Sequence, residues 1–273
     1  MKKIIKRGAA NVVRTFNLAN VSGAKVLLYH SISNQKSIDP LGLRVSVENF
    51  NEQLNYLLQE DYEISLLSDI VQKRKFHKNV IAITFDDGYL DNLEVAAPVL
   101  NKYKISATLF ISTAYLNGDQ PSINYWDKWD HLSADQLKSL IKSGFEIGSH
   151  SHLHHKLNDF SDEELEYQIR SSKEVLEDIV ESLPSNASIG GDVEIFSYPY
   201  GFYNERVKNV VRNCGFKSAC CNIIGMNDSN ADLFELKRIS ILANDSLDEF
   251  KSKLNGDYNW LGYFQRRQYY KKI

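Results

Sequence analysis

The sequence predicts a single α/β domain, a distorted (β/α) barrel of seven or eight strands. Short apolar runs alternate with stretches of helical spacing, which is typical of parallel sheets with helical connections. The chain has 273 residues and an apolar content of 43%, which is enough to bury one barrel-sized core. No glycine-rich dinucleotide turn follows an apolar run, and this favours a barrel over an open nucleotide-binding sheet.

The predicted elements follow one another in a regular order. Seven apolar runs are predicted to be strands, at residues 26–29, 80–85, 107–112, 145–149, 194–198, 217–221 and 236–241. Apolar side chains recur at helical spacing from Phe50 to Leu58, from Leu137 to Ile141 and through residues 163–183, which predicts amphipathic helices. The polar stretch at residues 184–192 is predicted to be a surface loop.

Composition narrows the possible partners and compartment. The formal net charge is only −3, so nothing indicates a nucleic acid as partner. Three cysteines, Cys214, Cys220 and Cys221, cannot all pair, which favours a reducing setting. Basic residues interrupt the segment 1–20, which lacks the apolar core of a secretory signal, and no later segment is apolar for long enough to span a bilayer. We therefore expect a cytoplasmic protein in which a basic segment, residues 1–20, precedes a barrel domain at residues 21–273 and could touch a membrane surface.

Two short polar segments carry the residue types of a catalytic metal site. Asp86 and Asp87 end one apolar run, and the sequence His-Ser-His-Leu-His at residues 150–154 ends another. One carboxylate and two imidazoles are the ligand set of an open, zinc-like site with room for a water. Neighbouring side chains on an extended backbone point in opposite directions, so Asp86 and Asp87 cannot both face the same ion. One of the two is therefore free to act as a base.

Further polar residues follow predicted strands. His30 comes after the run at residues 26–29, and the turn Pro199-Tyr200-Gly201 comes after the run at residues 194–198. In barrels, catalytic groups gather at the carboxyl ends of the strands. These residues are therefore predicted to lie around the same site as the two aspartates.

In their order and separation, three motifs resemble those of the polysaccharide deacetylase family. They are Thr-Phe-Asp-Asp-Gly at residues 84–88, His-Ser-x-x-His at 150–154 and Phe-x-Tyr-Pro-Tyr-Gly at 196–201. The resemblance implies a distorted β/α barrel and metal-dependent removal of acetyl groups from sugars. A divalent metal is implied, with zinc as the expected ion, although cobalt, nickel, manganese or iron would suit the same ligands.

The resemblance also implies a role for each motif residue. Asp86 matches the general base, and the position after Pro199 matches the backbone N–H that stabilises the oxyanion. That position is Tyr200. The implied metal ligands are Asp87, His150 and His154. From the residues alone His152 could replace His154, but the family spacing selects His154.

Two departures from the family pattern stand out. The third motif has Ser197 where the family often carries an arginine that orients the base, and Arg238, at a later strand end, could fill the same space. The late Leu-x-His motif, whose histidine serves as general acid, is missing. His30 is our candidate for that acid, because it is the only other histidine at the end of a predicted strand.

The expected substrate is an acetylated carbohydrate, and Trp126 could stack on one of its sugar rings. Two alternatives remain open from the sequence. The scaffold could hydrolyse a non-sugar amide, or the chain could be a degenerate sugar-binding module. The missing late histidine favours the second alternative, whereas a spare aspartate beside three metal ligands argues against it, because a binding module needs no base.

Overall fold

A computed structural model describes residues 22–36, 38–118, 129–184 and 193–270. Three sequence predictions concern residues outside these ranges: the basic segment 1–20, the side chain of Trp126 and all but the first residue of the loop 184–192. The predicted boundary between residues 20 and 21 stays a prediction for the same reason.

The centre of the molecule is a curled parallel sheet. Its strands run in the order β10-β1-β5-β6-β7-β8-β9, and the short strand β4 pairs with the start of β5. These strands are β1 (Lys25–Tyr29), β4 (Glu63–Ile64), β5 (Val80–Phe85), β6 (Thr108–Ile111), β7 (Glu146–Ser149), β8 (Ile195–Ser197), β9 (Ser218–Cys220) and β10 (Ile239–Ser240). Two further strands, β2 (Ser31–Ile32) and β3 (Arg44–Val45), form a separate parallel pair. The prediction of a distorted barrel is confirmed.

The two ends of the sheet meet at an irregular seam. Beyond an isolated parallel bridge between Cys220 and Leu236, the backbone N–H of Arg238 donates to the carbonyl of Ile223 at 3.0 Å. Few bonds hold this seam, which is why β10 is only two residues long although the apolar run at residues 236–241 predicts a longer strand. The backbone N–H of the next residue, Ile224, donates to the side-chain Oε1 of Gln265 at 2.7 Å.

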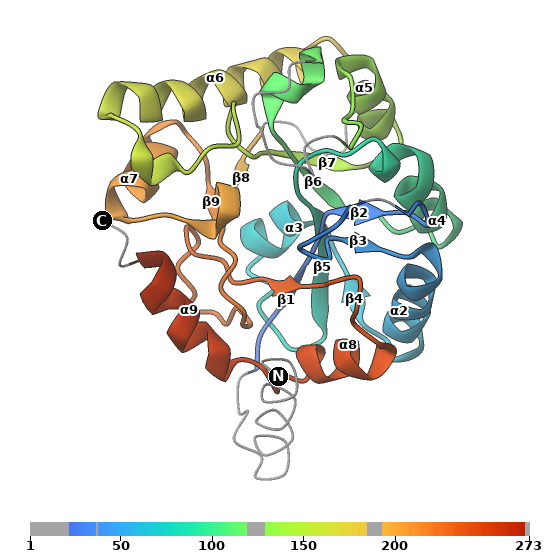
Figure 1. The fold of residues 1–273 in the computed structure, drawn as a ribbon. Helices are drawn as coiled ribbons and strands as arrows, with labels where there is room; N and C mark the ends of the chain where they lie inside the picture. The colour runs from blue at the N-terminus through green and yellow to red at the C-terminus, as the bar shows by residue number, and fades with distance from the viewer. Residues whose placement is uncertain (1–21, 37, 119–128, 185–192, 271–273) are drawn as a thin grey trace.

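Helices form the outer layer around the strands (Figure 1). They are α2 (Val47–Gln59), α4 (Ala97–Lys102), α5 (Ala134–Lys142), α6 (Asp162–Glu181), α7 (Glu205–Asn213), α8 (Leu247–Leu254) and α9 (Trp260–Tyr270), with a π-helical turn at Asn92–Ala96 and 3-10 turns at Thr113–Asn117, Leu157–Asp159 and Pro199–Gly201. Ser133 and Ser161 begin α5 and α6 with complete capping boxes, which satisfy backbone N–H groups that the first helical turn leaves free. The three helices predicted from apolar spacing correspond to α2, α5 and α6.

Two apolar clusters separate the inside of the barrel from its outside. The larger cluster lies between strands and outer helices and includes Leu27, Ile83 and Phe196. The smaller one contains residues of alternate strand positions, among them Val26 and Ala82, together with three side chains of the short helix α3 (Leu67–Gln72). Because α3 fills one end of the barrel, near the centre of Figure 1, only the other end can hold an open site.

Two further expectations concern the cysteines and the membrane. Cys214, Cys220 and Cys221 are all buried and free. Among the described helices, none combines the length and the apolar character needed to cross a bilayer.

Candidate active site

The candidate site lies at the carboxyl ends of the barrel strands. Asp86 and Asp87 directly follow β5, His150 follows β7 and His30 follows β1. The backbone N–H of Asp86 donates to the carbonyl of Tyr29 at 3.0 Å, so the β1–β5 pairing continues to the first aspartate. Parallel strands end at one edge of a sheet, and this brings together residues that lie far apart in the sequence.

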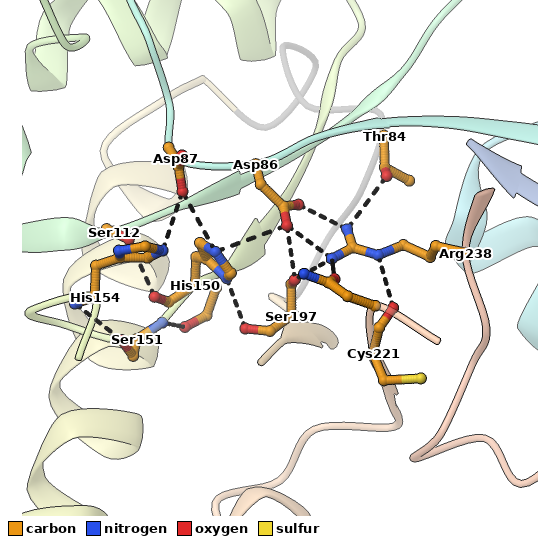
Figure 2. Close-up of polar contacts among 12 residues, drawn as sticks. Thr84, Asp86, Asp87, Ser112, His150, Ser151, His154, Ser197, Cys221 and Arg238 are labelled. Atoms are coloured by element: carbon orange, nitrogen blue, oxygen red, sulfur yellow. Dashed lines mark hydrogen bonds and ion pairs between the residues drawn. The ribbon is translucent and has the colours of Figure 1, made fainter. Parts of the chain in front are cut away.

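Asp87, His150 and His154 form a cluster that could hold a metal ion. Their ligand atoms all lie within 4.8 Å of one another. The Nε2 atoms of His150 and His154 are 3.5 Å and 3.2 Å from Asp87 Oδ1, and Figure 2 shows the three side chains converging. The acid and the first histidine come from the ends of β5 and β7, and His154 comes from the loop after β7.

The hydrogen bonds of the cluster fit a cation. The Nδ1 of His150 lies 2.7 Å from the carbonyl oxygen of Ser197, and a carbonyl only accepts, so Nδ1 carries the proton. The Nε2 of a neutral His150 therefore presents a lone pair toward Asp87. Asp87 Oδ1 is itself buried without a hydrogen-bond partner among the described residues. Two acceptor atoms that face each other in a buried site need a positive charge between them.

Four residues around the site have an unusual backbone conformation with a positive φ angle. Ser151 and His154 have φ angles of 65° and 54°, Asp87 has 74° and Tyr200 has 59°. Such angles cost free energy for residues with side chains, and they persist where the surroundings fix them. Four of the seven non-glycine residues with positive φ in the described ranges therefore lie at this one site.

Helix α6 fixes the histidine loop. The backbone N–H groups of His152 and Leu153 donate to the main-chain carbonyl and the side-chain Oε1 of Gln168, at 3.1 Å and 2.9 Å. Gln168 is buried, and the sequence analysis did not select it. A signal was present, because Gln168 follows Leu165 by three residues and precedes Ile169, so it is a polar residue on the apolar face of the predicted helix.

Asp86 lies between Arg238 and the cluster, with its Oδ2 3.7 Å from His150 Nε2. The guanidinium binds both carboxylate oxygens, NH1 to Oδ1 and NH2 to Oδ2, each at 2.7 Å. Ser197 Oγ also donates to Asp86 Oδ2, at 3.2 Å. The structure thus places Arg238, which directly precedes the strand β10, against the carboxylate that an arginine of the third motif would otherwise orient (Figure 2).

Arg238 is itself fully buried and completely surrounded by acceptors. Its Nε donates to the carbonyl of Cys221 at 3.1 Å, and its NH2 lies 2.7 Å from Asn222 Oδ1. Planar, bidentate pairing of this kind is specific to arginine. Asn222 was not selected from the sequence, since nothing local marks it as a partner of Arg238.

Electrostatics keep both aspartates ionised. Burial raises the pKa of Asp86, but the Arg238 guanidinium more than offsets this, so the pKa of Asp86 lies below its ordinary value. Burial likewise raises the pKa of Asp87, but the charge of the neighbouring His154 outweighs this, and the pKa lies well below the ordinary range. At neutral pH Asp86 is therefore a carboxylate able to accept a proton, and Asp87 is a carboxylate able to bind a cation.

His30 lies in the field of the same groups. Burial lowers the pKa of His30, while the charges of Asp87 and Asp86 act in the opposite direction. Its Nδ1 is buried without a hydrogen-bond partner among the described residues, and its carbonyl accepts a bond from Asn92 Nδ2 at 2.8 Å. His30 is thus a neutral imidazole near the two aspartates, with one ring nitrogen unused.

The turn after β8 completes the wall of the site. Pro199 and Tyr200 lie in a 3-10 turn, and the Tyr200 ring packs 4.7 Å from the ring of His154. Gly201 has a φ of +73°, and a Cβ there would lie 2.6 Å from Asn222 Cβ, so only glycine allows this turn to approach the loop after β9.

The chain is similar to known deacetylases. The model of the polysaccharide deacetylase family matches residues 73–219, more than half of the chain. A putative polysaccharide deacetylase of Bacillus subtilis is 28% identical over 79% of this chain and 70% of its own length. The poly-beta-1,6-N-acetyl-D-glucosamine N-deacetylase of Staphylococcus aureus is 29% identical over 63% of this chain, but this chain spans only 59% of that protein.

Solved structures share the fold. A Streptococcus pyogenes deacetylase, solved in complex with acetate, has a TM-score of 0.71 at 22% identity, over 85% of this chain and 98% of that one. A polysaccharide deacetylase from Bacillus cereus has a TM-score of 0.70 at 24% identity, over 85% of this chain and 69% of the other. By its motifs, its barrel and the match over residues 73–219, the chain belongs to the polysaccharide deacetylase family and is a hydrolase of that class.

Proposed function

We propose that this protein removes acetyl groups from an N-acetylated glycan by metal-assisted hydrolysis of the amide. The observation that carries the proposal is the pair of acceptor atoms, Asp87 Oδ1 and His150 Nε2, facing each other 3.5 Å apart, beside a second aspartate, Asp86, that is ionised and held by Arg238. The names of the similar deacetylases from Bacillus subtilis and Staphylococcus aureus support the substrate class.

Asp87, His150 and His154 would hold the divalent ion, for which we propose zinc. An ion bound there lowers the pKa of a water ligand and polarises the acetyl carbonyl. Asp86 receives the proton of the attacking water, and Arg238 keeps its carboxylate ionised and fixed in orientation. The backbone N–H of Tyr200 is proposed to donate to the acetyl oxygen as negative charge develops on it.

Cleavage of the carbon–nitrogen bond requires a proton on the leaving amine. His30 is neutral, so it must first take up the proton that Asp86 has removed from water and then pass it to the nitrogen. Water and amide thereby become acetate and a protonated sugar amine, and Asp86 returns to its ionised form. Arg238 cannot donate the proton in this step, because a guanidinium stays charged in proteins.

The test compares acetate release from N-acetylglucosamine oligomers by the zinc-loaded protein and by Asp86→Asn. The variant should keep its metal and lose at least about a thousandfold in kcat, because its amide cannot accept the proton. Asp178→Asn, an exposed carboxylate on α6, is the matched control and should behave as the wild type. Oligomer binding and metal binding without acetate release by the wild type would support the sugar-binding alternative, and activity only on non-sugar amides would support the amidase.

For His30, the variant His30→Ala should lose turnover while metal content stays the same. Turnover equal to that of the wild type would eliminate His30 as the proton donor. Metal content is measured by elemental analysis of the dialysed protein, so this readout does not depend on activity.

A further inference from the structure

The outer face of helix α9 is aromatic, although the helix lies at the periphery of the molecule (Figure 1). Tyr263 and Phe264 are 63% and 59% exposed. Among the described residues, six large apolar side chains are exposed, and only these two are neighbours in the sequence. Scattered exposed side chains need no explanation, whereas a contiguous exposed apolar patch marks an interaction site. The patch therefore indicates a partner that covers it.

The apolar side chains of α9 are distributed unlike those of an ordinary surface helix. Gly262 packs on the carbonyl oxygen of Ile224, and Gln265 accepts the N–H of the same residue. Leu261 is partly buried beside them. An ordinary surface helix turns its bulkiest apolar side chains toward the core. Here a glycine and a glutamine contact the barrel, and at 3.6 residues per turn the two exposed aromatic side chains lie on the other side of the helix.

The aromatic patch is continuous with a basic side chain. The rings of Tyr263 and Phe264 have centres 5.6 Å apart, and the ring of Trp260 lies 6.1 Å from that of Phe264. The exposed guanidinium of Arg267 lies 5.3 Å from the centre of the Tyr263 ring. Because Arg267 forms no ion pair with a carboxylate of the described residues, its charge is available to a partner.

Positive charge is concentrated at the two ends of the chain. Residues 260–273 include four basic residues and no acidic one, and residues 1–21 include five basic residues and no acidic one. Residues 22–259 hold the other 23 basic residues and all 35 acidic ones, which gives this part of the chain a net charge of −12. Such an asymmetry of charge indicates an anionic partner for the basic segments.

An anionic lipid surface fits this face better than a second copy of the chain. Aromatic residues together with arginine and lysine are typical of helices that lie in the membrane–water interface, and anionic lipids attract each basic side chain near the surface. A symmetric contact between two copies through α9 would instead bring the arginines of both copies together. Helix α9 is not a membrane-spanning segment, so it would lie along the surface.

We propose that α9 is a docking surface for an anionic membrane, with Tyr263 and Phe264 in the lipid interface and Arg267 at the lipid phosphates. The proposal does not depend on the proposed function, because none of these residues belongs to the metal cluster. It goes beyond that function by holding the protein on a lipid surface through residues that the sequence analysis did not select.

The experiment measures co-sedimentation of the full chain with vesicles of equal parts phosphatidylglycerol and phosphatidylcholine, and with vesicles of phosphatidylcholine alone. The wild type should bind the neutral vesicles at least about tenfold more weakly than the anionic ones. On anionic vesicles, Tyr263→Ala/Phe264→Ala should lower the partition coefficient about tenfold, because less apolar surface enters the interface. Arg267→Gln should lower it about fivefold, because one attractive charge is lost.

Two variants on other helices are matched controls. Tyr167→Ala removes a tyrosine that is 58% exposed on α6. Arg212→Gln removes an exposed arginine on α7, whose guanidinium lies 4.4 Å from the centre of the Phe234 ring. Both should bind the anionic vesicles as the wild type does. Equal binding of the wild type to both kinds of vesicle, or equal binding by the α9 variants and their controls, would overturn the docking surface.

Trp260 reports which face contacts the lipid, because its ring lies against Phe264. Lipids with brominated acyl chains should quench the fluorescence of the bound wild type. Trp260→Phe keeps an aromatic ring at this position, so it should still bind the vesicles and lose most of the quenching. Quenching of the same extent in both proteins would place the contact on another face and overturn the proposal.

Sedimentation velocity tests the second copy as the alternative occupant. A dimer that Tyr263→Ala/Phe264→Ala dissociates, in a chain that binds no vesicles, would overturn the membrane proposal and assign this face to self-association. Acetate release is measured separately. If no substrate releases acetate and the vesicle binding is as expected, the proposed function fails and the docking surface stands.

Discussion

Arg238 stabilises the one buried carboxylate that the proposed reaction needs as a base. Both groups are essentially inaccessible to solvent, with side-chain exposures of 0% and 2%. Removing one partner of a buried ion pair leaves an uncompensated charge, which costs about 3–5 kcal/mol. We therefore expect Arg238→Met to lower the free energy of unfolding in urea by about that amount, and the double variant Arg238→Met/Asp86→Asn to recover most of the loss.

A different substitution of Arg238 should change the pH profile. Without the guanidinium the pKa of Asp86 rises, so protonation of the base begins at higher pH. The acid limb of kcat/KM should therefore move to higher pH in Arg238→Lys, whose ammonium keeps the charge but cannot bind both oxygens. An unchanged limb in this variant would show that Asp86 does not control it.

Asp91 is a partly buried acid near the site, and its effect on stability has the opposite sign. Burial raises the pKa of Asp91 from 3.8 to about 6, although Ser31 and the N–H of Ile32 donate to it. Between these two values the native state binds more protons than the unfolded state, so stability falls as pH rises through this window. Asp91→Asn should remove that fall and gain roughly 1–3 kcal/mol at neutral pH, measured by urea unfolding at a series of pH values. If the stability of Asp91→Asn still falls over the same pH range, a group other than Asp91 causes the fall.

At the scale of elements, α6 connects the outer layer to the metal cluster through Gln168. The variant Gln168→Leu leaves the N–H of Leu153 without its acceptor and frees the loop that carries His154. Metal affinity, measured by competition with a chelator, should fall about tenfold or more. Ser161→Ala is the matched control, because loss of this N-cap costs about 1 kcal/mol of helix stability but leaves the bond to Leu153 in place. An equal fall of affinity in both variants would mean that helix stability alone matters.

Prediction from the sequence succeeded where a signal was local. Each of the seven apolar runs overlaps a strand of the large sheet, and Asp86, Asp87 and His150 mark the ends of two of them. Contacts between distant segments gave no such signal. Arg238 and Asp86 are 152 positions apart, and only the strand order β10-β1-β5 in the sheet makes them neighbours. The strands β2, β3 and β4 have two residues each, which is too short for a period of two to be recognised.

At the scale of the whole molecule, α9 covers the seam at which the barrel closes. A Cβ on Gly262 would lie 2.4 Å from the carbonyl oxygen of Ile224, so this helix packs directly on the backbone beside the seam. The neighbouring Gln265 binds the N–H of the same residue. The helix thus satisfies a backbone group that no strand of the described residues reaches.

This packing predicts that Gly262→Ala forces α9 away from the seam. Overpacking against backbone, which cannot rotate away as a side chain can, costs about 1–3 kcal/mol, so the midpoint of urea unfolding should decrease. Tyr263→Ala, in the next position and 63% exposed, is the matched control and should stay within about 0.5 kcal/mol of the wild type. Because α9 contributes no residue to the metal cluster, Gly262→Ala should keep its metal affinity. Loss of metal from Gly262→Ala at pH 7 would instead show that closure of the seam is needed to position Asp87 and the two histidines.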